Sequence, residues 1–168
     1  MDALRFKAEV FVLKDLLYRL AMRLLNNDAD AQDAVQQLMM KLWQKREGLA
    51  DVVHLRSFVT KALQNDCFNR LKKDQTVARH YQQIAAIQQH TRQVVPGNMV
   101  QIIINEINKL PEKQRVVIHL SDVEGFDAKE IAEIVEMDEG AVRANLSRAR
   151  KKIKIQIQKI TSYEERQL

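Results

Sequence analysis

Residues 110–153 read LPEKQRVVIHLSDVEGFDAKEIAEIVEMDEGAVRANLSRARKKI, and this stretch constrains the fold more than any other. Pro111 disfavours helical angles at Leu110, so one helix is expected to end there and another to begin with Pro111 in its first turn. The new helix should run over residues 112–120, and Gly125 marks its end. Its apolar face is formed by Val116, Val117 and Leu120.

Two further helices are expected after Gly125. Asp127 can cap the first of them while Glu130 completes a capping box, and its buried stripe is Ile131, Ile134 and Val135. Glu136 to Asp138 then form a tight turn. Asp138 caps the last helix, whose core positions are Val142, Leu146, Ala149 and Ile153. This order of helix, turn and capped helix predicts a helix-turn-helix.

Charge divides the same stretch in two. Residues 112–139 carry nine acidic and three basic side chains, whereas residues 140–160 carry seven basic side chains and no acidic one. A polyanion would therefore meet the last helix and avoid the two before it. The alternative, which explains most charge runs of this kind, is a solvated helix that closes a small bundle.

These motifs carry a resemblance. LPEKQR, DVEG, AKEIAEI and EGAVRANLSRARKKI resemble the C-terminal promoter-reading domain of bacterial RNA polymerase sigma factors of the sigma-70 family, in the extracytoplasmic-function group. The resemblance implies a sigma factor that binds core RNA polymerase, directs initiation at promoter DNA and is held inactive by an anti-sigma factor. Asn145 stands where the family usually has a basic residue, so the bases read here should differ.

Composition favours an all-α fold of two small helical domains. The chain has 168 residues, 5% aromatics, four glycines and two prolines, which disfavours a sheet-rich fold. The net charge of +5 suits a nucleic-acid partner, although charge alone does not distinguish DNA from RNA or an acidic membrane.

The sequence contains no pattern of a disulfide, a metal site or a catalytic site. The single Cys67 excludes an internal disulfide, and the four histidines lack metal-ligand spacing. No nucleotide-binding or nucleophile motif occurs, and no signal peptide or apolar run of membrane-spanning length. We therefore expect a cytoplasmic protein that is not an enzyme and uses no cofactor, metal or small-molecule substrate, and that does not insert into membranes.

The N-terminal region predicts a helical pair. Phe6, Val10, Leu13, Leu17, Leu20 and Leu24 alternate spacings of four and three, which predicts one amphipathic helix over residues 4–25. Asp28 or Asp30 is expected to cap a second helix, to about Arg46, that buries Val35, Leu38 and Leu42. The short connection predicts an antiparallel pair.

The second helix has a polar outer face. Met40 lies on that face, whereas Trp43 is expected in the core. The resemblance implies that this helix docks on a coiled coil of the polymerase's largest subunit, which makes the polymerase-binding candidates Asp33, Gln36, Gln37, Met40 and Lys41. Gln32 and Gln37 replace residues that are commonly acidic in relatives, so this surface should be less negative.

A third helix is expected over residues 54–73. Its core side is Val59, Leu63, Cys67 and Leu71, and its opposite side is Phe58, Lys61, Ala62, Asn65, Asn69 and Lys72. An aromatic, amides and lysines together could stack on and hydrogen-bond bases of a single strand. The resemblance assigns this helix to the minus-ten element, with the candidates Phe58, Lys61, Asn65, Asn69, Arg70 and Lys72. A surface helix with one aromatic tucked beneath a neighbour explains the pattern equally well.

The chain is expected to divide at a linker. Residues 74–98 are rich in glutamine, lose the clean periodicity and end in the turn signal VPGN. They separate an N-terminal domain of residues 1–73 from a C-terminal domain of residues 99–160, and a polar tail of residues 161–168 follows.

Base readout is expected from the start of the last helix. A major groove about 12 Å wide admits about eight helical residues, here 139–146, with Ser147 at the edge. Arg143 can form two hydrogen bonds to guanine, and Asn145 can form two to adenine. The Ala144 methyl group can contact the methyl group of thymine. Arg148, Arg150 and Lys151 lie beyond that window and are expected to bind phosphate.

Two other functions fit the same pattern. One is a stand-alone helix-turn-helix regulator, usually a symmetric dimer, and the other is a helical adaptor whose basic helix binds an acidic protein.

Overall fold

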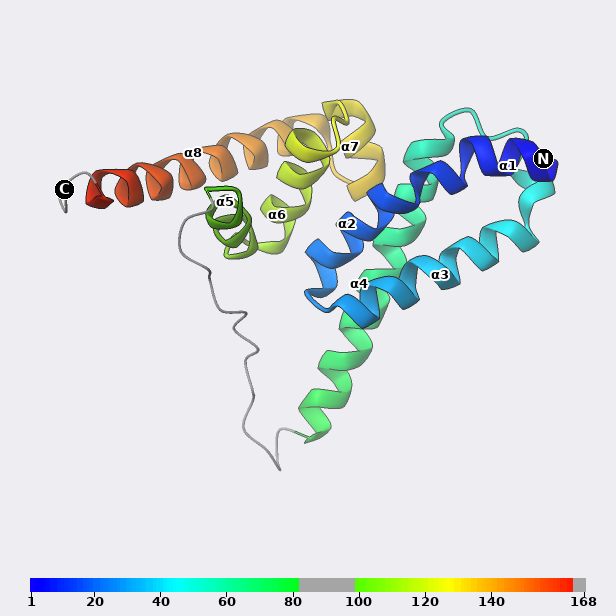
Figure 1. Cartoon of the computed structure of the whole chain (residues 1–168), viewed down its shortest axis with the longest axis horizontal. Helices are drawn as coiled ribbons and strands as arrows, with labels where there is room; N and C mark the ends of the chain where they lie inside the picture. Colours follow the sequence, from blue (N-terminus) through cyan, green and yellow to red (C-terminus); the bar gives the residue numbers. More distant parts are fainter. Residues whose placement is uncertain (82–98, 165–168) are drawn as a thin grey trace.

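The computed structural model describes residues 1–81 and 99–164, with side-chain detail for residues 1–73, 99–100 and 102–159. Every regular element in these ranges is helical, so the expected all-α fold is confirmed. Two groups of helices, one from residues 3–81 and one from residues 99–164, lie side by side and are in contact (Figure 1).

The first two helices replace the single helix expected over residues 4–25. α1 (Ala3–Glu9) and α2 (Lys14–Leu25) are joined by a 3-10 turn over Phe11–Leu13, so the prediction of one continuous helix is wrong. A 3-10 turn places residues three apart on the same side. Val10 is therefore fully buried and Leu13 partly buried, and the apolar stripe survives the break.

The second predicted helix is α3 (Asp28–Gln44), and it begins one residue earlier than expected. Asn27, with extended backbone angles, is its N-cap, and the Asn27 side chain accepts a hydrogen bond from the Asp30 backbone N–H at 3.2 Å. The expected cap at Asp28 or Asp30 is wrong because both already lie inside the helix. α3 runs back along α2 (Figure 1) and buries Val35, Leu38 and Leu42, as predicted.

The third predicted helix is α4 (Leu55–Tyr81), which packs on α2 and α3. Val59, Leu63 and Cys67 are fully buried and Leu71 is half-buried, in agreement with the predicted core side. The helix continues past residue 73, where the linker was expected to begin. The rest of the expected linker, residues 82–98, lies outside the described residues.

The C-terminal group follows the predicted order closely. Its elements are α5 (Met99–Asn108), α6 (Glu112–Ile118), a π-helical turn (His119–Val123), α7 (Ala128–Val135) and α8 (Glu139–Glu164). The break before Pro111 is confirmed, although Pro111 is the cap residue of α6 and not part of its first turn.

The helix-turn-helix forms as its local signals predict. The Glu130 backbone N–H donates to Asp127 Oδ1 at 2.8 Å and the Asp127 backbone N–H donates to Glu130 Oε2 at 2.9 Å, which completes the capping box. Asp138 caps α8 by accepting from the Ala141 backbone N–H at 2.8 Å. The stripe of Val142, Leu146, Ala149 and Ile153 is buried. Because α7 and this stripe pack together, the opposite side of α8 faces outward.

The π-helical turn buries a histidine. His119 is 1% exposed, and its Nε2 lies 3.3 Å from Glu124 Oε1 without a hydrogen bond to any group among the described residues. Burial, together with the positive charge of Arg23, lowers the pKa of His119 to about 4. The imidazole is therefore neutral at pH 7.

His119 should make the protein less stable as the pH falls from 7 to 5. In the unfolded chain a histidine has a pKa of about 6.5, so over this range only the unfolded state takes up the proton. The free energy of unfolding should fall by about 2 kcal/mol, measured by urea denaturation at both pH values. His119→Gln should reduce the fall, with His54→Gln, which removes an exposed histidine, as the control. An equal fall in all three proteins would contradict this assignment.

Candidate functional site

The outward side of α8 carries the basic residues that the sequence singled out. Arg143, Ser147, Arg148, Arg150 and Lys151 are exposed, whereas Ala144 and Asn145 are half-buried. No acidic residue occurs between Gly140 and Lys159, and the buried stripe fixes the direction in which the basic side chains point. Arg143, Arg148 and Lys151 spread over the exposed side of α8, whereas Arg150 lies on the flank that faces the π-helical turn.

The two predicted base readers are placed differently. The Arg143 side chain is 66% exposed and its Nη2 lies 2.6 Å from Glu139 Oε2, one turn earlier in α8. The Asn145 side-chain amide donates to the Ala141 backbone oxygen at 2.8 Å. At 100° per residue, Asn145 also lies beside the buried stripe and away from the centre of the exposed side. Arg143 is therefore the better placed of the two for base readout.

Arg150 has an internal partner. Its Nε donates to Asp122 Oδ2 at 3.0 Å and its Nη2 to Ser121 Oγ at 3.3 Å, so the guanidinium braces α8 against the π-helical turn. This hydrogen bond holds the pKa of Asp122 below its usual range. Sequence reasoning expected a phosphate contact here, and the partner was missed because it lies a whole helix-turn-helix away in the chain.

The predicted minus-ten side of α4 is largely exposed. Phe58 is 45% exposed, so it is not tucked beneath a neighbour, and Asn65, Asn69 and Lys72 are exposed as well. Lys61 is half-buried, and its Nζ lies 3.0 Å from Oε1 of Glu136 at the end of α7. Arg70 points toward α3 and away from this row.

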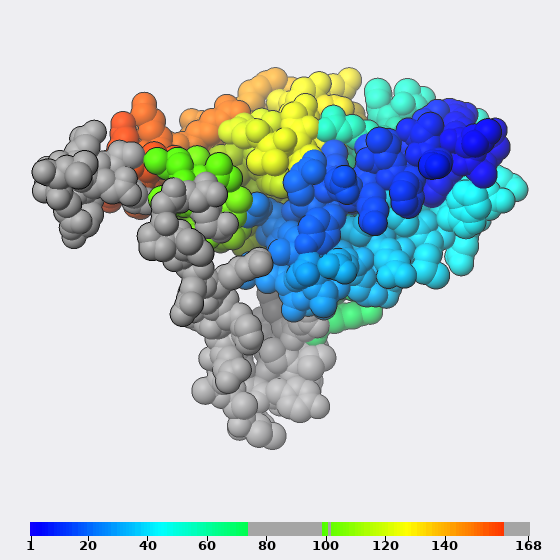
Figure 2. Space-filling model, in the orientation of Figure 1, coloured from blue at the N-terminus to red at the C-terminus, as the bar shows by residue number. Residues whose placement is uncertain are grey.

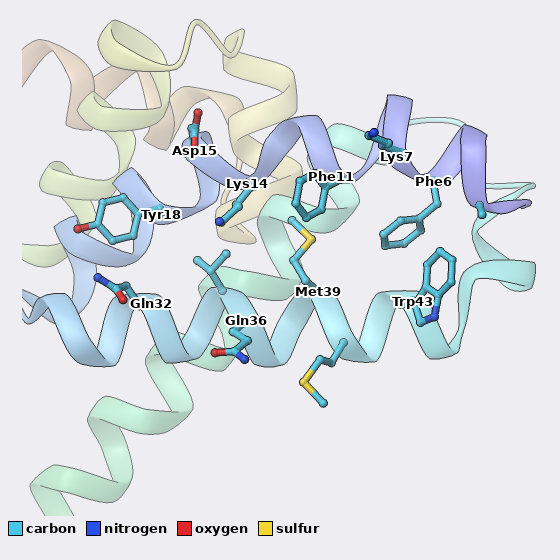
Figure 3. A pocket seen from close by; sticks show the side chains of 13 residues that line it. Phe6, Lys7, Phe11, Lys14, Asp15, Tyr18, Gln32, Gln36, Met39 and Trp43 are labelled. Atoms are coloured by element: carbon cyan, nitrogen blue, oxygen red, sulfur yellow. The ribbon is translucent and has the colours of Figure 1, made fainter.

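The outer side of α3 exposes all five candidates for polymerase binding, Asp33, Gln36, Gln37, Met40 and Lys41. Beside it, α1, α2 and α3 enclose a groove of about 920 Å³ that the sequence did not predict (Figure 3). Its apolar lining includes Phe6, Phe11, Tyr18, Val35, Met39, Met40 and Trp43. Lys7 and Lys14 stand at the same groove, so its apolar floor has a partly basic border.

Trp43 forms one wall of this groove, and the prediction that it belongs to the core is wrong. The side chain is 41% exposed. The Phe6 and Trp43 rings are nearly perpendicular, with 5.1 Å between their centroids, and the Arg46 guanidinium lies over the Trp43 ring at 4.5 Å from its centroid. The indole is thus an amphipathic side chain at the surface.

The two groups of helices are joined through Glu124, at the end of the π-helical turn. The Glu124 side chain is only 3% exposed, and Arg19 of α2 donates to both of its oxygens, each at 2.8 Å. Arg56 of α4 donates to the Glu124 backbone oxygen and stacks on Phe126 at 3.9 Å from the ring centroid. We call these four residues the Glu124 junction.

Two outlying contacts flank the Glu124 junction. Arg23 of α2 donates from Nη1 to Asn108 Oδ1 at 2.9 Å, and Lys61 pairs with Glu136 as described above. In the space-filling view the surface of α2 runs directly into that of the C-terminal group (Figure 2). Sequence reasoning missed the junction because no local pattern shows which arginine meets which carboxylate.

The part of the chain that the structure describes shows no metal cluster and no membrane span. Among the side chains of residues 1–73, 99–100 and 102–159 there is no group of three or more able to hold a metal ion. Over the same ranges, none of the helices combines the length and hydropathy that a bilayer span requires.

Comparison with known proteins shows the family to which the chain belongs. Residues 12–77 match Sigma-70 region 2 and residues 101–153 match Sigma-70, region 4, which together cover more than two thirds of the chain. The chain belongs to the sigma-70 family of RNA polymerase sigma factors, in the extracytoplasmic-function group. As a sigma factor, it directs promoter-specific transcription initiation.

Individual relatives span most of the chain. It is 25% identical over 149 residues to the ECF RNA polymerase sigma factor SigL of Mycobacterium tuberculosis, covering 86% of this chain and 84% of SigL. It is 27% identical over 150 residues to the RNA polymerase sigma-E factor of Streptomyces avermitilis, covering 88% and 82%.

Two solved structures share the fold. One is the sigma factor RpoE in complex with the anti-sigma factor NepR from Bartonella quintana, with a TM-score of 0.78, 22% identity and coverage of 92% of this chain and 97% of that one. The other is CnrH in complex with the cytosolic domain of CnrY, with a TM-score of 0.67, 18% identity and coverage of 94% and 90%.

Removing the charge from the Glu124 junction should let the two groups separate. Arg19→Ala leaves the buried Glu124 carboxylate without its bidentate partner, and the ratio of open to closed molecules should rise about five- to thirtyfold. Energy transfer between dyes on α3 and α8 would report the change. Arg5→Ala, which removes an exposed pair of the same 2.8 Å length within α1, is the control. Unchanged transfer in Arg19→Ala would show that the junction does not hold the groups together.

Proposed function

We propose that the chain is a dissociable specificity subunit with three working surfaces. The outer side of α3 and the adjoining groove bind core RNA polymerase, the exposed row of α4 binds the minus-ten element, and the basic side of α8 binds the minus-thirty-five element. The observation that carries this proposal is that each of the two matched family regions presents an exposed polar surface of the kind that its nucleic-acid partner requires.

Minus-thirty-five reading is supported by the geometry of α8. The helix begins at a capped turn, its first two turns expose Arg143, and Ser147, Arg148 and Lys151 are exposed directly after them. A helix laid in the major groove by its N-terminal turns would present Arg143, once it leaves Glu139, to base edges and the later cations to phosphates. Arg150 would contribute indirectly, by holding α8 in place through Asp122.

Minus-ten reading is supported by the combination of side chains on α4. The half-exposed Phe58 ring can stack on an unpaired base, and Asn65 and Asn69 are close enough to one another, at one turn, to hydrogen-bond neighbouring base edges. Lys61 would have to leave Glu136 before it could neutralise a phosphate. Full engagement of this surface therefore requires the Lys61–Glu136 pair to break.

Polymerase binding is supported by the surface around α3. Met40 is 55% exposed beside the groove, and Trp43, Phe11 and Met39 extend the apolar area. Exposed methionine and aromatic side chains of this kind mark protein interfaces more often than solvated surface. A helix of the polymerase could lie along α3 with its apolar side in the groove.

The family and the two structural relatives also support an inhibitory partner. RpoE and CnrH were each solved in complex with a binding protein, NepR and CnrY, the first of them an anti-sigma factor. We propose that an anti-sigma factor holds this chain inactive as well, and that the chain works in the cytoplasm, where core polymerase and promoters are found. Its contribution to initiation is binding energy, with no chemistry of its own.

Transcription with purified core polymerase tests the proposal. Adding the chain to core polymerase and genomic fragments should produce initiation at defined positions, and omitting it should abolish those starts. A stand-alone regulator would instead bind duplex DNA tightly and specifically without polymerase. An adaptor would show no effect on nucleic acid under either condition.

Arg143→Ala and Lys151→Ala should separate base reading from phosphate binding. A bidentate contact to guanine contributes about 1 to 3 kcal/mol of discrimination, so Arg143→Ala should reduce initiation about five- to 150-fold, only at promoters that carry the contacted base. Lys151→Ala should weaken all promoters alike by a few-fold. The measurement is start-site sequencing on a promoter library. Equal losses across the library for both variants would refute this division.

A further inference from the structure

α3 and α4 are linked by a compact polar network on the side away from the buried core. On α3, Asp33, Gln37 and Lys41 follow one another at intervals of four, and on α4, Asp66 and Arg70 do the same. These intervals stack each set on one side of its helix, so the two sets meet along a line. All five side chains belong to candidate surfaces of the proposed function or adjoin them.

Arg70 is the centre of this network. Its Nη1 donates to Asp33 Oδ2 at 2.7 Å, its Nη2 to Gln37 Oε1 at 2.9 Å and its Nε to Asp66 Oδ2 at 2.9 Å. Each of the three guanidinium nitrogens thus has an acceptor, two on α3 and one on α4. The Arg70 side chain is only 23% exposed, which leaves its charge largely enclosed by these partners.

The acceptors are themselves fixed. The Gln37 side-chain amide donates to both Asp33 oxygens, at 3.2 and 3.0 Å, and Lys41 Nζ lies 3.4 Å from Asp66 Oδ1. The hydrogen bond from Arg70 holds the pKa of Asp33 below its usual range, so this carboxylate stays charged. The planar Arg70 guanidinium, bound to two carboxylates and one amide, fixes the orientation of α4 relative to α3 as well as their separation. A lysine at the same place would not fix the orientation.

The network lies between two proposed working surfaces. Asp33, Gln37 and Lys41 belong to the polymerase-binding candidates, while Asn65 and Asn69, directly before Asp66 and Arg70, belong to the exposed minus-ten row. The sequence placed Arg70 itself among the DNA contacts, but its three donors are used by α3 and α4.

We propose that Arg70 is a positioning residue that sets the minus-ten row of α4 from the polymerase-binding side of α3, and that it does not bind DNA phosphate itself. The proposal rests on the proposed function of these two surfaces. It implies that polymerase contact with α3 and strand capture by α4 are energetically coupled through one guanidinium, since anything that fixes Asp33 and Gln37 also fixes the direction of the Asn65 and Asn69 side chains.

The salt dependence of DNA binding distinguishes positioning from phosphate contact. Holoenzyme formed with saturating core polymerase would be titrated with a fluorescent single-stranded minus-ten oligonucleotide at several salt concentrations. Arg70→Met and Arg70→Lys should each weaken binding about five- to tenfold, because neither side chain can satisfy three acceptors, and the slope against log salt should stay that of the wild type. The preference among oligonucleotide sequences should also remain.

A direct phosphate contact would give a different pattern. Arg70→Met would then lower the slope by about 0.7, and Arg70→Lys, which keeps the charge, would restore most of the affinity. That result would overturn the proposal. Lys72→Met, on the exposed side of the same helix, is the matched control that should lower the slope. If wild-type holoenzyme does not bind the oligonucleotide at all, the proposed minus-ten surface fails and not the role of Arg70 alone.

A double-mutant cycle gives a second readout that does not depend on one variant folding well. Asp33→Ala should weaken capture of the oligonucleotide by saturated holoenzyme although Asp33 lies on α3, and it should add little in the Arg70→Met background. Full additivity of the two losses would show that Arg70 does not act through Asp33. Circular dichroism melting of each variant identifies the temperature at which all of them are folded for these measurements.

Discussion

The arrangement of the two helical groups depends on one buried carboxylate. Glu124 has a side chain that is 3% exposed, and an isolated charge at such a depth is unstable unless it is paired. Arg19 supplies two hydrogen bonds from the other group, and the Arg56 guanidinium covers the adjoining Phe126 ring. The charge is therefore satisfied only while the groups are together, or once separation has exposed it to water.

Because water can replace Arg19 as the partner of Glu124, the Glu124 junction fixes how the two groups fit together but adds little free energy to hold them. The desolvation penalty of Glu124 offsets much of its attraction to Arg19, and separation returns both charges to water. A junction made largely of apolar surface would lose all of its burial on opening. If α4 and α8 read separate promoter elements as proposed above, a polar junction lets the two groups separate at a smaller cost in free energy than an apolar one. Lys61, paired with Glu136 at the edge of the contact, belongs to the side of α4 proposed to bind the minus-ten element.

The sequence predicted what is locally encoded. The capping box of Asp127 and Glu130, the break before Pro111 and the stripe of α8 each depend on residues within one or two turns, and all three are confirmed. The resemblance of residues 110–153 then predicted the family, which the comparisons confirm. Two predictions were wrong, that of one continuous helix over residues 4–25 and that of a buried Trp43. Periodicity is preserved across a 3-10 turn, so it does not reveal the break, and it does not show which apolar side chains a neighbouring helix covers.

The candidate sites show a second limit of sequence reasoning. Five candidates have the right chemistry for DNA, yet each has an internal partner: Lys61, Arg70, Arg143, Asn145 and Arg150. A side chain with an internal partner already has a fixed rotamer, so it would lose little conformational entropy on binding DNA. Its charge or amide, however, is already paired within the protein. Residue type alone predicts that all of them contact DNA. The structure distinguishes residues that are free to contact DNA from residues that orient their neighbours. Arg150 and Arg70 hold α8 and α4 against their neighbours, which leaves the exposed side chains beside them available for the DNA contacts proposed above.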